Sequence, residues 1–398
     1  MPAMKKKVAL IIERADVTRG GAERSVFELA IALSGRGLEV HLLAAKGQAN
    51  TKNVHILCGN SLGKRTCYFT FAKALKKHLS ENHFDVVHSA LPFTFADVYQ
   101  PRGGSFAESI SRNAASYQNK FLTSFKKITA FANSRRTILL QAEKKLCKDN
   151  DGPVIVALSE YVAGQFKQHY RIDEQRLMVI PNGIKLNKHI DTAQADRLRT
   201  QILAQLQLIE ADNPVFFLFV ANNFRLKGLT CLIKAMHLAA RCDTARQPYL
   251  IVAGSGSTRR YRRLAKKFNI HKRIVFLGPL RHIQNALSII DMAVLPTFYD
   301  PSSRYILEAI AADKPVITTK FNGATDLFVD NRHGKVIDTP QNTAALAQAI
   351  TFFTDTGNIQ KASQAIIEDK LKEKISISRV AEQLESLYQS LPPKQRLK

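Results

Sequence analysis

The sequence predicts an α/β protein built from two doubly wound domains. Short apolar runs alternate with helix-forming stretches in the first half of the chain, and the same alternation repeats in the second half. Strands that alternate with helices form parallel sheets covered by helices on both faces. A chain of 398 residues is long enough for two such domains. The boundary is predicted near residues 183–191, which gives domains at 1–185 and 186–374.

The first half predicts five strands and at least three helices. A helix should follow the glycine loop at residues 18–21, because apolar side chains at positions 26, 29, 30 and 33 have helical spacing. A basic helix at about residues 66–79 precedes the third strand, and Ser159 should cap a helix after the fourth. The predicted strands are Val8–Ile12, Val40–Ala44, Asp85–Ser89, Val154–Leu158 and Met178–Pro181.

The second half begins with a polar helical stretch at residues 191–208, and a further helix starts at Leu229. In doubly wound domains ligands bind at the carboxyl ends of the strands, so the loops that follow strands are the candidate sites. The predicted strands are Val215–Ala221, Tyr249–Ala253, Ile274–Leu277, Met292–Pro296 and Pro315–Thr318.

Charge and composition narrow the class of protein. The chain has 58 Lys and Arg against 33 Asp and Glu, a net charge of +25, and basic proteins bind polyanions such as nucleic acid, anionic lipid or phosphorylated glycans. No apolar run is long enough to span a bilayer. The five cysteines are scattered without metal-ligand spacing, which favours a reducing, cytoplasmic location and predicts no metal site.

The basic excess is greatest between Arg102 and Lys148. This segment has ten basic residues against Glu108 and Glu143, and four phenylalanines are interspersed, at positions 106, 121, 125 and 131. It is either a solvated pair of basic helices or a patch that binds an anionic membrane surface, since charge and aromatic contact together hold a membrane better than charge alone. No recognised nucleic-acid motif is present, so no nucleic-acid partner is predicted.

Two glycine loops follow predicted strands. Gly20 and Gly21 precede a helix, where free N–H groups attract phosphate and glycine lets a ligand approach closely. Gly254 and Gly256 end another strand and are candidates to hold a sugar or phosphate. Either pair can also be a simple tight turn. The second loop is not a dinucleotide fingerprint, because the third glycine is missing.

Cations and carboxylates follow two other strands. Arg225 and Lys227 lie between a strand and a helix, where they would neutralise a diphosphate; the alternative is a solvated basic loop. Asp300 precedes a proline and can cap a helix. Glu308 lies in an apolar stretch where a carboxylate needs a partner, and a ribose diol is one candidate. Residues 149–151 resemble an acid-x-acid metal motif but are predicted to be a loop.

Taken together, these motifs resemble the retaining glycosyltransferases of family 4, which have the GT-B fold of two Rossmann-like domains facing a cleft. The Asp300-x7-Glu308 block resembles the family's Glu-x7-Glu signature with Asp in first place. Within the family, residues 96–99 and the basic insertion after them are most similar to lipopolysaccharide core glucosyltransferases. The matching blocks are residues 20–24, 179–183, 224–228, 253–256 and 299–309.

The resemblance implies a role for each motif. Glu308 would bind the donor ribose, Asp300 the sugar hydroxyls, and Lys227 the diphosphate, with Arg225 compensating for Leu226 in the usual arginine position. The remaining predicted residues are Gly20, Gly21, Gly254, Gly256, Ser302 and Ser303 at the donor, and Asp97, Arg102, Gly103 and Gly104 near the reacting sugar. A last helix at residues 375–390 would pack back on the N-terminal domain.

The implied reaction is transfer of glucose from UDP-glucose, with retention and without a metal or other cofactor, to a lipopolysaccharide core or related lipid-linked glycan. The protein would act as a monomer, peripherally, on the cytoplasmic face of the membrane. Three alternatives stay open: a sugar-nucleotide epimerase on the same fold, a basic polyanion-binding protein without catalysis, and an inactive relative of the family.

Overall fold

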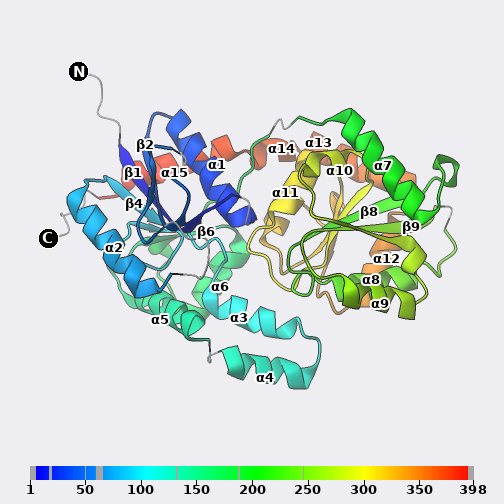
Figure 1. The fold of residues 1–398 in the computed structure, drawn as a ribbon, viewed down its shortest axis with the longest axis horizontal. Helices are drawn as coiled ribbons and strands as arrows, with labels where there is room; N and C mark the ends of the chain where they lie inside the picture. The colour runs from blue at the N-terminus through cyan, green and yellow to red at the C-terminus, as the bar shows by residue number, and fades with distance from the viewer. Residues whose placement is uncertain are drawn as a thin grey trace. The chain divides into compact units, whose positions relative to one another are not determined.

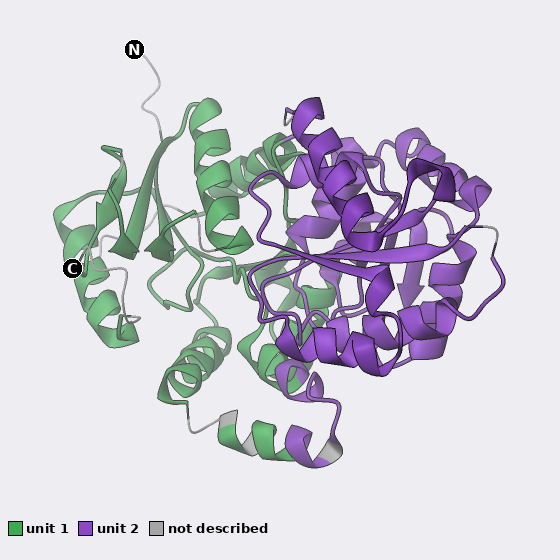
Figure 2. Ribbon diagram, turned by 45° about the vertical axis from the view of Figure 1, so that its right-hand side comes forward, with its two compact units in different colours: residues 1–111, 124–185, 375–398 green, residues 112–123, 186–374 purple. Residues whose placement is uncertain are grey.

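The chain divides into two units, each with one parallel sheet (Figures 1 and 2). The computed structural model describes residues 6–17, 20–49, 51–59, 66–130, 133–186, 189–244 and 246–392. Unit 1 comprises residues 1–111, 124–185 and 375–398, and unit 2 comprises residues 112–123 and 186–374. The sequence analysis places residues 112–123 in the first domain, whereas the structure groups them with unit 2, because their contacts are mainly with that unit.

The unit 1 sheet has the strand order β3-β2-β1-β4-β5-β6-β7, and all its ladders are parallel. Its strands are β1 Lys7–Ala15, β2 Glu39–Gly47, β3 Val54–Ile56, β4 Val86–Ser89, β5 Val98–Tyr99, β6 Val154–Ala157 and β7 Leu177–Val179. Its helices are α1 Gly21–Gly35, α2 Tyr68–Glu81, α3 Phe106–Ala115, α4 Lys120–Ala130, α5 Ser134–Lys148, α6 Glu160–Tyr170, η1 Glu174–Arg176 and α15 Ile377–Ser390; α3 and α4 extend into residues 112–123.

The unit 2 sheet has the order β10-β9-β8-β11-β12-β13 and is also parallel. Its strands are β8 Val215–Val220, β9 Pro248–Ala253, β10 Ile274–Gly278, β11 Met292–Leu295, β12 Val316–Thr319 and β13 Gly334–Ile337. Its helices are α7 Thr192–Leu206, η2 Glu210–Asp212, α8 Leu229–Ala239, α9 Arg259–Lys267, η3 His271–Arg273, α10 Ile283–Ser288, α11 Arg304–Ala311, η4 Gly323–Leu327, α12 Thr343–Phe352, α13 Thr356–Glu368 and α14 Leu371–Lys374.

The apolar runs of the sequence become the buried central strands. Along β8, Val215 to Phe219 are fully buried, since helices cover both faces of a parallel sheet and every side chain of a central strand points into a core. The predicted α/β fold of two doubly wound domains is confirmed. Three strands had not been predicted, β3, β5 and β13, because they are short or only partly buried and leave little apolar signal.

The last helix completes the core of unit 1. On α15, Val380, Leu384 and Tyr388 are buried with residues of α1 and the central strands. The chain returns to unit 1 through paired backbone bonds, in which Ile184 N donates to Ile375 O and Ile377 N donates to Ile184 O. A Cβ on Gly183 would lie 2.7 Å from a methyl carbon of Val380, so only glycine lets the helix approach this closely.

Candidate functional site

The strand order of unit 2 places a switch point between β8 and β11. From β8 the chain runs outward through β9 and β10, and it then resumes on the other side with β11, β12 and β13. In open α/β sheets ligands bind outside the carboxyl ends of the strands at such a point, because the connections diverge there and leave a crevice. The loops 221–228 and 296–303 follow these two strands, and they carry the predicted donor residues Arg225, Lys227, Asp300, Ser302 and Ser303.

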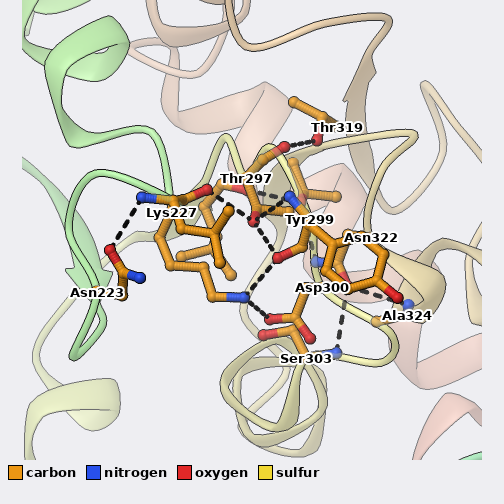
Figure 3. A network of polar contacts seen from close by, with 12 residues as sticks. Asn223, Lys227, Thr297, Tyr299, Asp300, Ser303, Thr319, Asn322 and Ala324 are labelled. Atoms are coloured by element: carbon orange, nitrogen blue, oxygen red, sulfur yellow. Dashed lines mark hydrogen bonds and ion pairs between the residues drawn. The ribbon is translucent and has the colours of Figure 1, made fainter. Parts of the chain in front are cut away.

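Lys227 and Asp300 meet at this switch point (Figure 3). The ammonium of Lys227 lies 2.6 Å from Asp300 Oδ2 and donates a second hydrogen bond of 2.8 Å to Tyr299 O. Only 20% and 14% of the two side chains are exposed. A mostly buried cation fixed by one carboxylate and one carbonyl is already positioned to meet an anionic ligand, so little ordering entropy remains to be lost on binding.

The loop 221–228, which carries Lys227, packs against the loop that follows β11. Phe298 N donates 2.9 Å to Leu226 O, and Leu226 N donates 3.2 Å to Asn223 Oδ1 within a tight turn. Gly228 has a φ of +81°, and a Cβ there would lie 1.9 Å from Pro296 O. Glycine is therefore required at position 228, and this contact fixes Lys227 opposite Asp300.

A buried asparagine, which sequence reasoning missed, holds the start of α11. Asn322 is fully buried, its Oδ1 accepts from Ser303 N at 3.2 Å and from Ala324 N at 3.1 Å, and its Nδ2 donates to Thr318 (Figure 3). Asp300 is joined to the same segment, because its N donates to Phe321 O. A polar residue just after a predicted strand was the available signal. Asn322 thus positions the loop that carries Asp300, Ser302 and Ser303.

Glu308 has a protein partner one helical turn away. Arg304 Nε lies 3.2 Å from Glu308 Oε1, and both side chains are about nine-tenths buried. The i, i+4 spacing could have identified Arg304 from the sequence. The predicted need of this carboxylate for a partner is thus met by a cation, which holds the carboxylate in place; its predicted role at a ribose stays a prediction.

The glycines after β9 are required by packing. Gly254 has a φ of +133°, and a Cβ there would lie 1.7 Å from Ala221 O; a Cβ on Gly256 would lie 2.6 Å from the Phe224 ring. The loop is therefore packed directly against the loop that follows β8. Ser255 is exposed, and its hydroxyl donates to Asn222 Oδ1 at 3.0 Å.

Arg225 is held by residues 112–123. Its guanidinium donates to Asn113 O at 2.9 Å and to Asn113 Oδ1 at 2.7 Å, contacts the Ser116 hydroxyl, and lies 3.9 Å from the centre of the Tyr117 ring. These partners occupy the donors that the sequence analysis assigned to a diphosphate, so the structure ties Arg225 to this segment while Lys227 faces the switch point.

Unit 1 has its own switch point, between β1 and β4. Gly20 and Gly21 lie there, since α1 begins at Gly21 and Gly20 caps it without a side-chain hydrogen bond. Backbone N–H groups at such a helix start favour an anion. Gly20 has an extended backbone, and a Cβ would meet only Glu23 at 3.4 Å, so its conformation does not itself require glycine. Thr18 and Arg19 lie outside the described residues.

A buried histidine lies beside this point. His88 Nδ1 is 2.6 Å from the Tyr388 hydroxyl of α15, and burial with the nearby Arg102 charge lowers the pKa of His88 to about 3. A small pocket of unit 1 is lined by His88, Gln100, Arg102 and apolar residues of β1 and α1. Gln100 lies close enough to His88 to influence its pKa, but its amide atoms make no hydrogen bond of good geometry within the described part of the chain. Sequence reasoning found neither His88 nor Gln100.

Asp97 lies at the opposite edge of the sheet. It precedes β5, and its Oδ2 accepts 2.7 Å from Val87 N near the start of β4. This edge is the amino-terminal one, where α/β sheets do not bind ligands, so its position does not support the role predicted for Asp97 near the reacting sugar. Arg102, Gly103 and Gly104 do follow the carboxyl end of β5, and Gly104 has a φ of +67°.

The basic segment 102–148 is anchored by a buried carboxyl group. Glu143 of α5 accepts 2.8 Å from the Tyr99 hydroxyl and 2.8 Å from Phe106 N, and it also accepts from Tyr170. Burial raises the pKa of Glu143 to about 7. Phe106 packs against the core of unit 1 and is not an exposed membrane contact, which corrects that part of the predicted patch.

Helix α4 does expose apolar side chains. Phe121 is 89% exposed, Phe125 56% and Leu122 45%, and Lys126 lies beside the Phe125 ring. Phe131, the fourth phenylalanine of the predicted patch, lies outside the described residues. No helix in the described part of the chain is both long and apolar enough to cross a membrane. Among the described residues, no cluster of His, Cys, Asp or Glu has the arrangement of a metal site.

Comparison with known proteins matches each half of the chain to a glycosyltransferase family. Residues 19–188 match Glycosyltransferase Family 4, and residues 204–371 match Glycosyl transferases group 1. The lipopolysaccharide glucosyltransferase WaaG of Escherichia coli K12 is 21% identical over 343 residues, which cover 83% of this chain and 85% of WaaG.

Solved structures share the fold. A crystal structure of WaaG, described as a glycosyltransferase of lipopolysaccharide biosynthesis, has a TM-score of 0.75 at 19% identity and covers 96% of this chain and all of its own. Anabaena HepE, solved with UDP and glucose, has a TM-score of 0.68 at 16% identity, covering 97% of this chain and all of its own. The two family matches, which together span residues 19–188 and 204–371, show that the chain belongs to the family 4 and group 1 glycosyltransferases, and the similarity to the solved structures shows that it has the GT-B fold.

Proposed function

We propose that this glycosyltransferase transfers glucose, with retention of configuration, from UDP-glucose to a lipopolysaccharide core or related lipid-linked glycan. The observation that carries the proposal is the Lys227–Asp300 pair, at the point where α/β sheets bind ligands. UDP and glucose in HepE and the lipopolysaccharide substrate of WaaG support the choice of donor and acceptor.

The leaving group determines what the donor site must supply. When the bond between the anomeric carbon and the diphosphate breaks, negative charge develops on the diphosphate oxygens, and a fixed cation lowers the barrier to that step. We assign this charge stabilisation to Lys227, assisted by the N–H groups at the start of α11 near Ser302 and Ser303. Because these groups carry the positive charge, the proposed mechanism needs no metal ion.

Two carboxylates orient the donor. Asp300, which holds the Lys227 ammonium in the free protein, accepts hydrogen bonds from sugar hydroxyls, and Glu308 accepts them from the ribose while Arg304 fixes its rotamer. Arg225, held by residues 113–117, is assigned a supporting role at the edge of the donor site. The loop at Gly254 and Gly256 borders the same site.

Retention follows from attack on the face that the diphosphate leaves. The acceptor oxygen attacks the anomeric carbon directly, so the proposed mechanism has no enzymic nucleophile. The proton of the acceptor hydroxyl passes to a departing diphosphate oxygen. Residues of unit 1 at the carboxyl edge of its sheet, Gly20, Gly21 and Arg102 to Gly104, are proposed to meet the acceptor side of the reaction.

The acceptor is proposed to be reached from the cytoplasmic face of the membrane, with the protein bound peripherally as a monomer. The support is helix α4, which exposes Phe121 and Phe125 beside Lys126. Aromatic side chains that enter the headgroup region and cations that attract anionic lipid act together, so the binding is reversible and sensitive to salt.

Transfer itself is the test. The purified protein is incubated with UDP-[14C]glucose and a lipopolysaccharide acceptor that lacks its outer sugars, and the product is analysed for radiolabel and by NMR for its anomeric configuration. The proposal predicts an α-linked glucose whose formation requires the acceptor. Acceptor-independent conversion of UDP-glucose to a different UDP-sugar would instead identify an epimerase, and unchanged UDP-glucose with every acceptor would contradict the proposal.

A further inference from the structure

Unit 2 contains a second basic segment, as dense in Lys and Arg as residues 102–148. Residues 244–290 have the same length as residues 102–148 and the same number of Lys and Arg, ten, but no Asp or Glu at all. All ten lie outside the loops that carry the donor site, and eight are in or next to α9 and η3, between residues 259 and 273. This concentration has no part in the proposed transfer reaction.

The cations of α9 lie on one face of the helix. Arg259, Arg262, Arg263 and Lys266 are spaced i, i+3, i+4 and i+7, which places them on neighbouring turns of the same side. All four are exposed, and within the described part of the chain none of them forms an ion pair with a carboxylate. Like charges at this spacing repel one another, and cations in the first turn also oppose the helix macrodipole. Among the described residues, no carboxylate offsets this repulsion.

The same four side chains line a groove. It has a volume of 390 Å³ between α9 and the edge strand β10, and it is also lined by His271 and by the apolar side chains of Ala265, Ile274 and Phe276. The Arg262 guanidinium lies 4.6 Å from the centre of the Phe276 ring, so it is stacked in place. Arginine binds phosphate in a bidentate manner, and a stacked guanidinium loses little freedom when it does so.

We propose that this groove is a binding site for a compact group bearing several phosphates, such as a polyphosphorylated sugar. A lipid surface fits less well, because no large apolar side chain is exposed on α9, whereas α4 exposes Phe121 and Phe125. The groove gathers three guanidinium groups along one concave surface, which matches clustered phosphates on one scaffold better than a flat layer of headgroups. The site does not depend on the proposed transfer reaction.

Inositol hexakisphosphate is the probe, because it carries phosphates on one carbon ring, and inorganic tripolyphosphate shows whether a ring is needed. Each is titrated calorimetrically into the full-length protein with UDP present in excess, so that the donor site is occupied. Arg259→Gln/Arg263→Gln removes two groove charges. Arg241→Gln/Lys361→Gln is the matched control, since it removes two exposed charges elsewhere in unit 2.

We expect one saturable inositol hexakisphosphate site, weakened about tenfold or more by the groove variant and left nearly unchanged by the control, since a hydrogen bond to a charged group is worth about tenfold in affinity. If tripolyphosphate binds as tightly as inositol hexakisphosphate and is weakened by the same groove variant, free polyphosphate is the source of the ligand. Equal loss in both variants would show a general charge effect and overturn the proposal. So would binding of phosphatidylglycerol vesicles through these arginines without any binding of the soluble probes.

Separate readouts distinguish failure of this site from failure of the proposed function. Transfer from UDP-glucose and binding of UDP are measured on the same preparations, and the groove variant should unfold at or above the wild-type temperature, because it removes two charges that repel their neighbours. Absence of transfer with intact probe binding would reject only the proposed function. Intact transfer without any probe binding would reject only the groove.

Discussion

The Lys227→Ala substitution tests the donor site most sharply. It removes an ammonium that lies 2.6 Å from Asp300 Oδ2 and 2.8 Å from Tyr299 O. A unit charge about 4 Å from a phosphate oxygen is worth about 4 kcal/mol at an effective dielectric constant of about 20. Because the two side chains are still 20% and 14% exposed, solvent lowers this value toward the lower end of what one preorganised contact supplies, about 2.7 kcal/mol. That corresponds to about a 100-fold loss of kcat/KM.

The assay is the initial rate of glucose transfer at a subsaturating concentration of UDP-glucose. Lys372→Ala is the matched control, since Lys372 Nζ also lies 2.6 Å from a carboxylate, that of Asp313, in the same unit but away from the switch point. The control should keep the wild-type kcat/KM. A wild-type rate in Lys227→Ala, or an equal loss in Lys372→Ala, would refute the assignment. Asp300→Asn added to Lys227→Ala should recover part of the loss, because it removes an unpaired carboxylate beside the diphosphate.

Three further predictions follow from the contacts described above. Glu308→Gln should weaken UDP and UDP-glucose to the same extent in calorimetry, because the ribose is common to both; unchanged affinity would make Glu308 only a partner of Arg304. Burial raises the folded-state pKa of Glu143 above its unfolded value of 4.5 to about 7, so its contribution to stability is present below pH 4.5 and is lost as pH rises through 7. In the wild type this lowers the free energy of unfolding by about 1.4 kcal/mol per pH unit in that range, and Glu143→Gln should lack this pH dependence in urea unfolding. If the pH dependence is the same in both proteins, Glu143 is ionised when folded. Phe121→Ser/Phe125→Ser should reduce sedimentation with anionic vesicles while kcat with a soluble acceptor is kept; undiminished sedimentation would remove α4 from the membrane surface.

Much of the fold could be predicted because apolar strands and glycine loops leave local signals. β8 is a run of six apolar residues, and β1 and β9 are nearly as clear. β5 could not be predicted, because its two residues, Val98 and Tyr99, become a strand only through pairing with β4 and β6. For the same reason the sequence could not show at which edge of the sheet Asp97 lies, since this depends on where β5 begins.

The candidate site was only partly predictable. Lys227 and Asp300 each follow a predicted strand, so their position at the carboxyl edge of the sheet could be expected, but their direct contact depends on which strands are neighbours. The partners of Arg225 come from residues 113–117, more than a hundred positions away, and no local pattern indicates them. Asn322 accepts hydrogen bonds from the backbone N–H groups of Ser303 and Ala324. Nearly every residue has such a group, so the sequence does not show which residues are the partners of Asn322.

Hydrogen–deuterium exchange with UDP-glucose tests the central claim most directly, because it reports which segments a bound donor covers. The account predicts protection of the loops 221–228 and 296–303 and of the start of α11, with no change in α9. Glu308→Gln should lessen this protection at the same concentration of UDP-glucose. Protection that avoids both loops, or none at a concentration that saturates binding, would contradict the placement of the donor site at the switch point between β8 and β11.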